Sequence, residues 1–164
     1  MIILEGCDCT GKTTLASKLT ERYHAPVTHY SKHDHDTMLE HAKVGAPGTE
    51  EIVDRFHMSE IPYSMYFRHT IPEYDSVKEI DLVLRDTKCL QIVCSPTWNF
   101  VKARWEERRE KELVQNLEAL HGIYIWYRDK SQAFSSFSVW QYDYTTTSVE
   151  SLCEKINVWS NEDA

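Results

Sequence analysis

The stretch Gly6-Cys7-Asp8-Cys9-Thr10-Gly11-Lys12-Thr13 decides the fold of this chain. It follows the short apolar run of residues 1–4 and precedes the helical pattern of residues 14–19. A strand, a glycine loop ending in Gly-Lys-Thr and a helix, in this order, are the context of a phosphate-binding P-loop. In 164 residues, the pattern arises by chance with a probability of roughly one in two hundred. The stretch therefore predicts nucleotide binding.

The residue types of this loop suit a triphosphate and a metal ion. Glycines let successive backbone N–H groups turn toward a phosphate, and the helix N-terminus adds partial positive charge. Lys12 is expected to reach the β- and γ-phosphates, and Thr13 to offer its hydroxyl to Mg²⁺. We therefore expect ATP and Mg²⁺ as cofactors. The residues expected at the ATP phosphates are Gly6, Asp8, Cys9, Thr10, Gly11, Lys12, Thr13 and Thr14.

Composition limits the class of partner. The chain is 41% hydrophobic and carries a net charge of −8, whereas a protein that binds a polynucleotide usually presents a basic face. We therefore expect nucleotides as partners and no nucleic acid, with a homodimer left open. No apolar run is long enough to span a membrane. The N-terminus lacks a signal-peptide layout, and the five cysteines are an odd number, so we expect reduced thiols and a cytoplasmic location.

The rest of the chain alternates between strand and helix patterns. The expected strands are residues 1–4, 27–30, 51–53, 90–94 and 137–142. The expected helices are residues 13–23, 38–43, 58–69, 73–86, 113–124 and 149–159. Gly122 is expected to loosen the fifth helix, and residues 128–130 to end it. Such alternation predicts an α/β fold of three layers, a P-loop kinase fold with a five-stranded parallel sheet flanked by helices. Residues 1–164 are expected to form one domain.

Two polar segments leave alternatives open. Residues 102–112 are rich in both charges, which is typical of a solvated helix; the same residues would also suit a mobile lid, about 99–113, whose arginines close over a transferred phosphate. The stretch His33-Asp34-His35-Asp36, with His41 nearby, could bind a metal or form a solvated loop. Its spacing fits no usual ligand pattern, which favours the loop.

Asp54-Arg55 follows the third expected strand, where residues of a parallel sheet face the ligand crevice. Together with the P-loop it carries a family resemblance. Residues 4–14 have Glu before the first glycine and Asp two residues after it, and residues 54–68 read Asp-Arg-aromatic, then Ser, Tyr and Arg. Both stretches resemble the corresponding stretches of the thymidylate kinases and related deoxynucleotide kinases, with the matching residues at the same spacing. The chain departs from that family at residues 31–34, which lack its acidic-Pro-Gly-Gly-Thr stretch.

The resemblance implies a role for each matched residue. Arg55 would bind the phosphate of an acceptor nucleotide, and Arg68 would meet the edge of its base. Asp8 would lie near the acceptor sugar or the metal. Asp54 would hold water or Mg²⁺ and orient Arg55. The charged run occupies the lid position of the family, which implies catalytic roles for Arg104, Arg108 and Arg109.

The leading function is therefore ATP-dependent phosphoryl transfer to a deoxynucleoside monophosphate. An arginine donates hydrogen bonds and cannot accept them, so Arg68 favours a base with a carbonyl: dTMP or a 5-substituted dUMP, with dGMP next. Tyr63 and Phe67 could supply an apolar surface for the ring. The alternatives are a kinase of a deoxynucleoside or of a modified base in DNA, and a P-loop binding module without transfer.

Overall fold

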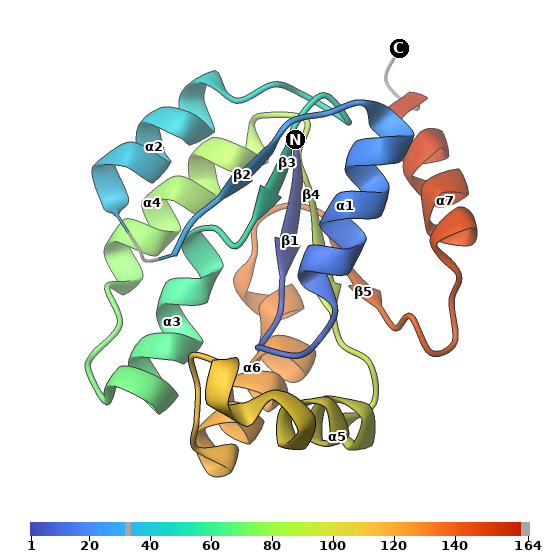
Figure 1. The fold of residues 1–164 in the computed structure, drawn as a ribbon. Helices are drawn as coiled ribbons and strands as arrows, with labels where there is room; N and C mark the ends of the chain where they lie inside the picture. Colours follow the sequence, from blue (N-terminus) through green and yellow to red (C-terminus); the bar gives the residue numbers. More distant parts are fainter. Residues whose placement is uncertain (32–33, 162–164) are drawn as a thin grey trace.

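Five parallel strands form one sheet in the order β2-β3-β1-β4-β5 (Figure 1). The computed structural model describes residues 1–31 and 34–161. The strands are β1 (Ile2–Glu5), β2 (Val27–His29), β3 (Ile52–Asp54), β4 (Leu90–Cys94) and β5 (Val139–Tyr142). All four strand pairs are parallel. The sheet confirms the predicted α/β fold with five parallel strands.

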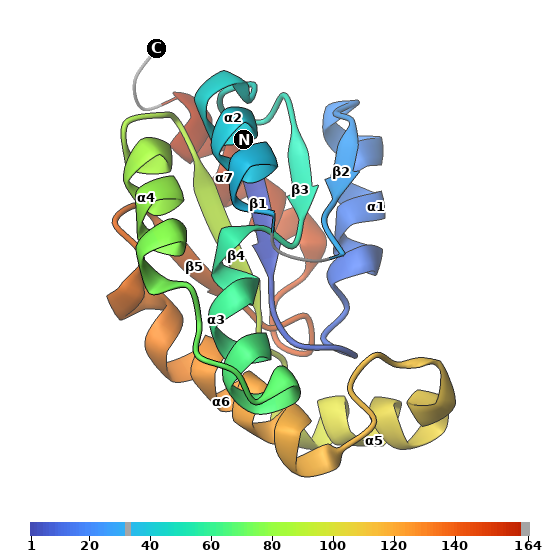
Figure 2. The ribbon, with the colours of Figure 1, turned by 90° about the vertical axis from the view of Figure 1, so that its left-hand side faces the viewer.

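Helices cover both faces of the sheet (Figures 1 and 2). They are α1 (Lys12–Tyr23), α2 (His35–Val44), α3 (Glu60–Tyr63), α4 (Tyr74–Arg85), α5 (Trp98–Arg108), α6 (Leu117–Phe134) and α7 (Val149–Asn161). A 3-10 turn (His57–Ser59) precedes α3, a π-helical turn (Ser64–Arg68) follows it, and another 3-10 turn (Arg109–Lys111) follows α5. No helix of the described ranges has the length and apolarity needed to cross a bilayer.

The side chains of β1 alternate between the two faces of the sheet, which explains why helices pack on both faces and form three layers. Ile2 and Leu4 are fully buried in the core that α1 and α7 cover, while Ile3 is buried in the core that α2 and α4 cover. Successive side chains of a strand point to opposite faces, so an uninterrupted apolar strand must be covered on both sides. The chain then leaves β1 at the P-loop, beside which α5 lies (Figure 1).

Helix α6 begins and ends later than the sequence pattern predicted. α6 does not end near residues 128–130 but runs through them and through Gly122 to Phe134. A Cβ atom at Gly122 would lie 2.4 Å from the ring of Tyr66, so the glycine permits close packing here rather than breaking the helix. Leu113, expected inside this helix, precedes it and is half-exposed.

The segment with alternating His and Asp residues has structural partners where it is described. α2 begins at His35 rather than at Met38, because the side chain of Asp34 accepts a hydrogen bond from the backbone N–H of Thr37 and caps the helix. His35 lies 2.9 Å from a carboxylate oxygen of Glu79 on α4. His33 lies outside the described residues.

The carboxylate of Asp81 joins α4 to the turn between α6 and β5. It is fully buried, and it accepts hydrogen bonds from Lys78 at 3.0 Å, Ser135 at 3.1 Å and the backbone N–H of Ser136 at 2.9 Å. Burial alone would raise the pKa of Asp81, but hydrogen bonds from His57, Ser136 and Lys78 hold the pKa well below its ordinary value. The folded protein therefore holds this group ionised.

We expect Asp81→Asn to lower the free energy of unfolding by about 3 kcal/mol at neutral pH, because it removes one partner of a buried charged network. A depressed carboxyl pKa contributes stability above the unfolded pKa, and that contribution is lost as pH falls through the folded pKa. The variant should therefore lose less stability than the wild type on acidification below about pH 4. Urea unfolding between pH 3 and 7 measures this. The exposed Asp86→Asn variant is the control, and equal acid slopes would contradict the assignment.

Candidate functional site

The loop between β1 and α1 has the backbone that the P-loop prediction requires. Gly6 and Gly11 have φ angles of 139° and 84°, which L side chains rarely adopt. A Cβ atom at Gly6 would also lie 2.7 Å from the carbonyl oxygen of Cys94. The hydroxyl of Thr10 donates to the carbonyl of Cys7 at 2.8 Å and closes the loop.

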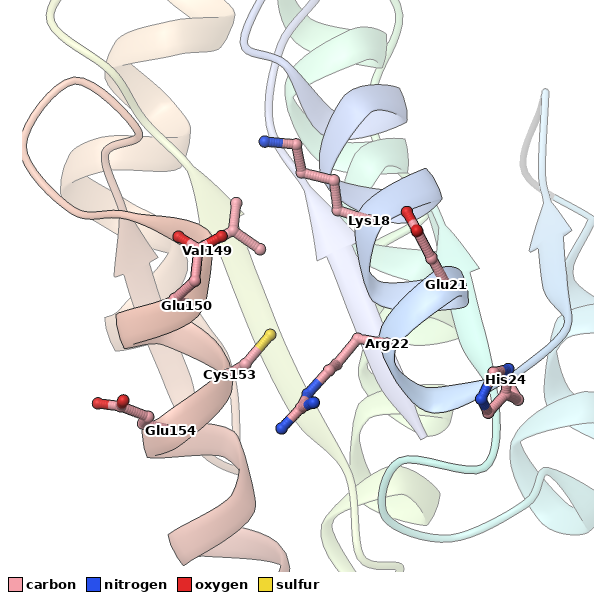
Figure 3. A pocket seen from close by; sticks show the side chains of 8 residues that line it. All are labelled: Lys18, Glu21, Arg22, His24, Val149, Glu150, Cys153 and Glu154. Atoms are coloured by element: carbon pink, nitrogen blue, oxygen red, sulfur yellow. The ribbon is translucent and has the colours of Figure 1, made fainter.

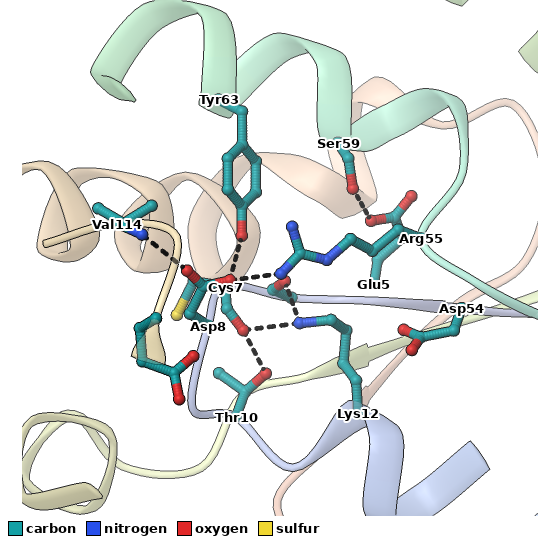
Figure 4. Close-up of polar contacts among 12 residues, drawn as sticks. Glu5, Cys7, Asp8, Thr10, Lys12, Asp54, Arg55, Ser59, Tyr63 and Val114 are labelled. Carbon is teal, nitrogen blue, oxygen red and sulfur yellow. Dashed lines mark hydrogen bonds and ion pairs between the residues drawn. The ribbon is translucent and has the colours of Figure 1, made fainter. Parts of the chain in front are cut away.

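Lys12 lies inside this loop (Figure 4). Its side chain is buried, and Nζ donates to the carbonyl oxygens of Gly6 and Cys7, each at 2.7 Å. Burial lowers the pKa of Lys12, and the nearby charge of Arg55 lowers it further. A phosphate placed in the loop would give this ammonium a partner of opposite charge in place of neutral carbonyls.

A cavity of about 300 Å³ opens in front of the loop, and we call it the phosphate cavity. It brings together the P-loop, the carboxyl ends of β2 and β3, and two of the three predicted lid arginines. Its lining residues are Asp8, Cys9, Thr10, Gly11, Lys12, Thr13, Thr14, His29, Asp54, Arg55, Arg104, Arg108 and Glu112.

Thr13 and Asp54 fit a magnesium ion in this cavity. Asp54 Oδ2 lies 3.2 Å from Nδ1 of His29, while Oδ1 is buried without a hydrogen-bond partner among the described residues. The side chain of Thr13 is exposed at the start of α1 and lines the same cavity. Magnesium is typically bound by one or two protein oxygens together with substrate phosphates, and this donor set matches that requirement.

Asp8 holds three parts of the protein together (Figure 4). One carboxylate oxygen accepts from Arg55 Nη2 and from the hydroxyl of Tyr63 at 3.0 Å; the other accepts from the backbone N–H of Val114 at 3.1 Å. Burial alone would raise the pKa of Asp8, but the charges of Arg55 and Lys12 hold it below its ordinary value. Both oxygens thus have protein donors, and the contact of Asp8 with the acceptor sugar or the metal, which the resemblance implies, stays a prediction.

Arg55 lies at the junction of two cavities, because it lines both the phosphate cavity and a smaller one beside α3. Its backbone adopts a left-handed φ of 65°, and its guanidinium lies 4.9 Å from the centre of the Tyr63 ring. Burial disfavours the charge of Arg55, but Tyr63 and Asp8 keep its pKa above the ordinary value. A permanent positive charge is therefore fixed between the two cavities.

Glu5 is a site residue to which the sequence analysis gave no role. It is fully buried at the end of β1, and it accepts from the backbone N–H of Phe56 at 2.9 Å, Ser59 Oγ at 2.6 Å and the hydroxyl of Tyr127 at 2.8 Å. Burial raises the pKa of Glu5. These contacts fix the backbone directly after Arg55. In the sequence, the feature that points to Glu5 is its position as a carboxylate at the end of an otherwise apolar strand.

The smaller cavity, of about 150 Å³, contains the residues expected to meet a base, and we call it the acceptor cavity. Arg68 Nη2 donates to Glu60 Oε2 and to Ser64 Oγ, each at 2.5 Å. The rings of Tyr63 and Phe67 lie 6.5 Å apart at 82°. The lining residues are Tyr30, Ser31, Met38, Arg55, Phe56, Ser59, Glu60, Tyr63, Phe67, Arg68 and Leu113.

The three predicted lid arginines have different surroundings on α5 and the turn that follows it. Arg104 lies over the ring of Tyr144, 5.8 Å from its centre. Arg108 Nε lies 3.1 Å from Glu112 Oε1 within the phosphate cavity. Arg109 lies over the ring of Trp105 at 5.3 Å and does not line that cavity. The structure therefore brings Arg104 and Arg108, but not Arg109, to the P-loop.

A third cavity, of about 360 Å³, lies between the first turns of α1 and the segment that joins β5 to α7, and we call it the donor cavity. It shares Gly11, Thr14 and Arg104 with the phosphate cavity. Its lining residues are Gly11, Thr14, Leu15, Lys18, Arg104, Tyr142, Tyr144, Thr147, Ser148, Val149 and Glu150.

A groove of about 620 Å³ continues from the donor cavity between α1 and α7 (Figure 3). Lys18 and Arg22 line it from α1, and Glu150 and Glu154 line it from α7, with the carboxylate of Glu154 turned away from α1. Two basic and three acidic side chains line the groove, so it has no excess of positive charge for a phosphate.

Comparison with known proteins supports the architecture. No protein-family model matches the sequence, and no curated protein sequence matches it. Among solved structures, the chain is similar to the YorR protein of Bacillus subtilis in complex with phosphorylated GDP, with a TM-score of 0.69 and 21% identity over 96% of this chain and 93% of that one. Deoxyadenosine kinase from M. mycoides with bound dCTP gives a TM-score of 0.60 and 16% identity over 96% and 100%. The chain therefore has the P-loop kinase fold over nearly its whole described length.

Proposed function

We propose that the protein transfers the γ-phosphoryl group of ATP to a deoxynucleoside monophosphate, with dTMP or a 5-substituted dUMP preferred. The observation that carries this proposal is the position of Arg55. Its charge lies between the phosphate cavity and the acceptor cavity, where the phosphate of an acceptor nucleotide would be. A neutral acceptor would offer this charge no anionic group beyond Asp8, with which Arg55 is already paired.

The order of the cavities supports a reaction between two nucleotides. The donor cavity meets the phosphate cavity at Gly11, Thr14 and Arg104, and the phosphate cavity meets the acceptor cavity at Arg55. A nucleoside in the donor cavity would direct its phosphates along the P-loop toward Arg55. Phosphoryl transfer needs the attacking and leaving oxygens to approach the same phosphorus from opposite sides, and adjoining cavities would bring the phosphates of the two nucleotides together.

The mechanism needs charge neutralisation more than proton transfer. An oxygen of the acceptor phosphate is already ionised at neutral pH, so it attacks the γ-phosphorus without a general base as the bond to the β-phosphate oxygen breaks and ADP leaves. Lys12, Arg55, Arg104 and Arg108 surround this path and would stabilise the spread negative charge. Bound Mg²⁺ would neutralise the β- and γ-phosphates.

The second candidate acceptor is a neutral deoxynucleoside. The similarity to a deoxyadenosine kinase favours it. A transfer assay with ATP and Mg²⁺ separates the candidates when a deoxynucleoside, a deoxynucleoside monophosphate and DNA are offered in parallel. We expect the monophosphate to be converted to the diphosphate. Transfer to the deoxynucleoside alone, to DNA alone or to none of them would contradict the proposal.

The proposed location of the enzyme is the cytoplasm. All five cysteines are free thiols, as is usual in a reducing compartment.

Lys12→Ala should leave the fold intact and reduce turnover at least about a hundredfold, as loss of an electrostatic stabiliser does. Steady-state kinetics with ATP measures the effect, and circular dichroism checks the fold. Lys43→Ala, which removes an exposed lysine of α2, is the control. A folded Lys12→Ala variant with near-normal turnover would mean that the P-loop does not act in transfer.

Arg55→Ala should raise the KM for the monophosphate at least about tenfold, because a hydrogen-bonded charge pair with phosphate is lost. Any activity on a free deoxynucleoside should change much less. The exposed Arg85→Ala variant of α4 is the control, and Arg55→Lys, which keeps the charge, should recover part of the affinity. Equal losses on both acceptors would instead indicate that Arg55 is only structural.

Arg108→Ala and Arg104→Ala should lower kcat more than they weaken acceptor binding, because both residues line the phosphate cavity and a transition-state contact affects turnover. Arg109→Ala provides a matched control on the same segment, since its guanidinium lies on Trp105 outside the cavity. Single-turnover rates and acceptor titrations measure the two quantities. Three silent variants would show that the segment is a solvated helix.

A further inference from the structure

We propose that Glu60 is a base-reading residue of the acceptor cavity and accepts the ring N–H of thymine or uracil while Arg68 donates to the neighbouring carbonyl. This inference rests on the proposed function and names the chemical edge that the acceptor must present. The family resemblance implies base reading by Arg68, whereas in the structure Arg68 is paired with a carboxylate in the same cavity.

Three side chains fix the geometry of this pair. Glu60 Oε2 accepts from Arg68 Nη2, and Glu60 Oε1 accepts from Ser64 Oγ, each at 2.5 Å. Arg68 Nη2 also donates to Ser64 Oγ at 2.5 Å and to the backbone carbonyl of Glu60 at 3.3 Å. Glu60 and Ser64 are buried, while the side chain of Arg68 is 37% exposed. The pair is therefore held on the protein side and accessible on the cavity side.

The π-helical turn explains why residues eight apart can meet. In a regular α-helix, position 68 would be rotated by about 80° from position 60 around the axis. Residues Ser64–Arg68 form a wider π turn, which takes up more residues per turn and keeps Arg68 on the side of Glu60. Such turns occur frequently at functional sites. The π turn therefore brings Arg68 within hydrogen-bonding distance of Glu60.

The hydrogen-bond capacity left on the pair defines the ligand. All protein contacts described for the Arg68 guanidinium are made by Nη2, so Nε and Nη1 can donate to a base. Each carboxylate oxygen of Glu60 already accepts one hydrogen bond and can accept another. The pair thus offers donors together with an acceptor. It complements an edge that carries both carbonyl oxygens and an N–H group.

Thymine and uracil present such an edge: carbonyl, N–H, carbonyl. Arg68 alone would leave the ring N–H unpaired in a buried site, which is costly, and Glu60 removes that cost. Cytosine presents an amine and then a bare nitrogen at the same two ring positions, so a fixed pair that matches thymine opposes cytosine. Guanine presents a carbonyl, a ring N–H and an amine, and the two oxygens of the Glu60 carboxylate can accept from both donors, so the pair opposes cytosine but leaves dGMP as the competing acceptor.

The test is Glu60→Gln, which keeps the size of the side chain and turns an N–H₂ group toward the base or toward Arg68. We expect kcat/KM for dTMP and 5-hydroxymethyl-dUMP to fall at least about tenfold, mainly through KM, while dCMP is affected less, so that the ratio of dTMP to dCMP falls. Glu40→Gln is the matched control, because it also breaks a carboxylate pair, on the exposed side of α2. Ser64→Ala should shift the ratio in the same direction by a smaller factor.

An unchanged ranking, or equal losses on all four deoxynucleoside monophosphates, would overturn the assignment of Glu60. Equilibrium binding of dTMP and dCMP to the wild type and to Glu60→Gln separates this outcome from failure of the proposed function. If no monophosphate is phosphorylated, the proposed function fails, but a loss of dTMP binding specific to the variant would still support base reading by Glu60. Equal dTMP binding by both proteins would refute it.

Discussion

The buried carboxylate of Asp8 is the constraint on which the site depends. An ionised carboxylate away from water costs several kcal/mol unless donors surround it. Here the donors come from three distant segments: Arg55, Tyr63 and the backbone of Val114. Each segment therefore has its position relative to the P-loop set by the same charge. Displacing any one of them would leave that charge short of partners, so the P-loop, Arg55 and the segment at Val114 form one unit.

Glu5, a second buried carboxylate, helps to hold the backbone of Arg55 in an unfavourable left-handed conformation. A left-handed conformation costs an L residue about 1–2 kcal/mol, and Arg55 has a φ of 65°. Glu5 holds the next backbone N–H, that of Phe56, and Asp8 holds the guanidinium. The strained residue is thus fixed at both its backbone and its side chain. Arg55 in this conformation lies at the junction of two cavities.

The sequence predicted those features whose signals are local. The glycines and lysine of the P-loop, the apolar strands and the Asp54-Arg55 step at a strand end are visible in a few consecutive residues. The structure places the second half of the P-loop beside Asp54 and Arg55 at one cavity. The continuation of α6 through Gly122 could not be predicted in this way, because its cause is the ring of Tyr66, 56 positions earlier in the chain. Pairings across the fold, such as those of Asp8 and Glu5, likewise leave no periodic pattern.

The charges of the site explain how an acidic chain can hold polyanions. The net charge is −8, so the protein as a whole does not attract a nucleotide from a distance. Within the phosphate cavity the cations are close together, and each already contacts protein oxygens: Lys12 the loop carbonyls, Arg55 Asp8, and Arg108 Glu112. A phosphate that enters would therefore exchange these partners rather than meet free charges. Since exchange requires short, well-aligned contacts, the selection of ligand depends on cavity geometry more than on long-range attraction.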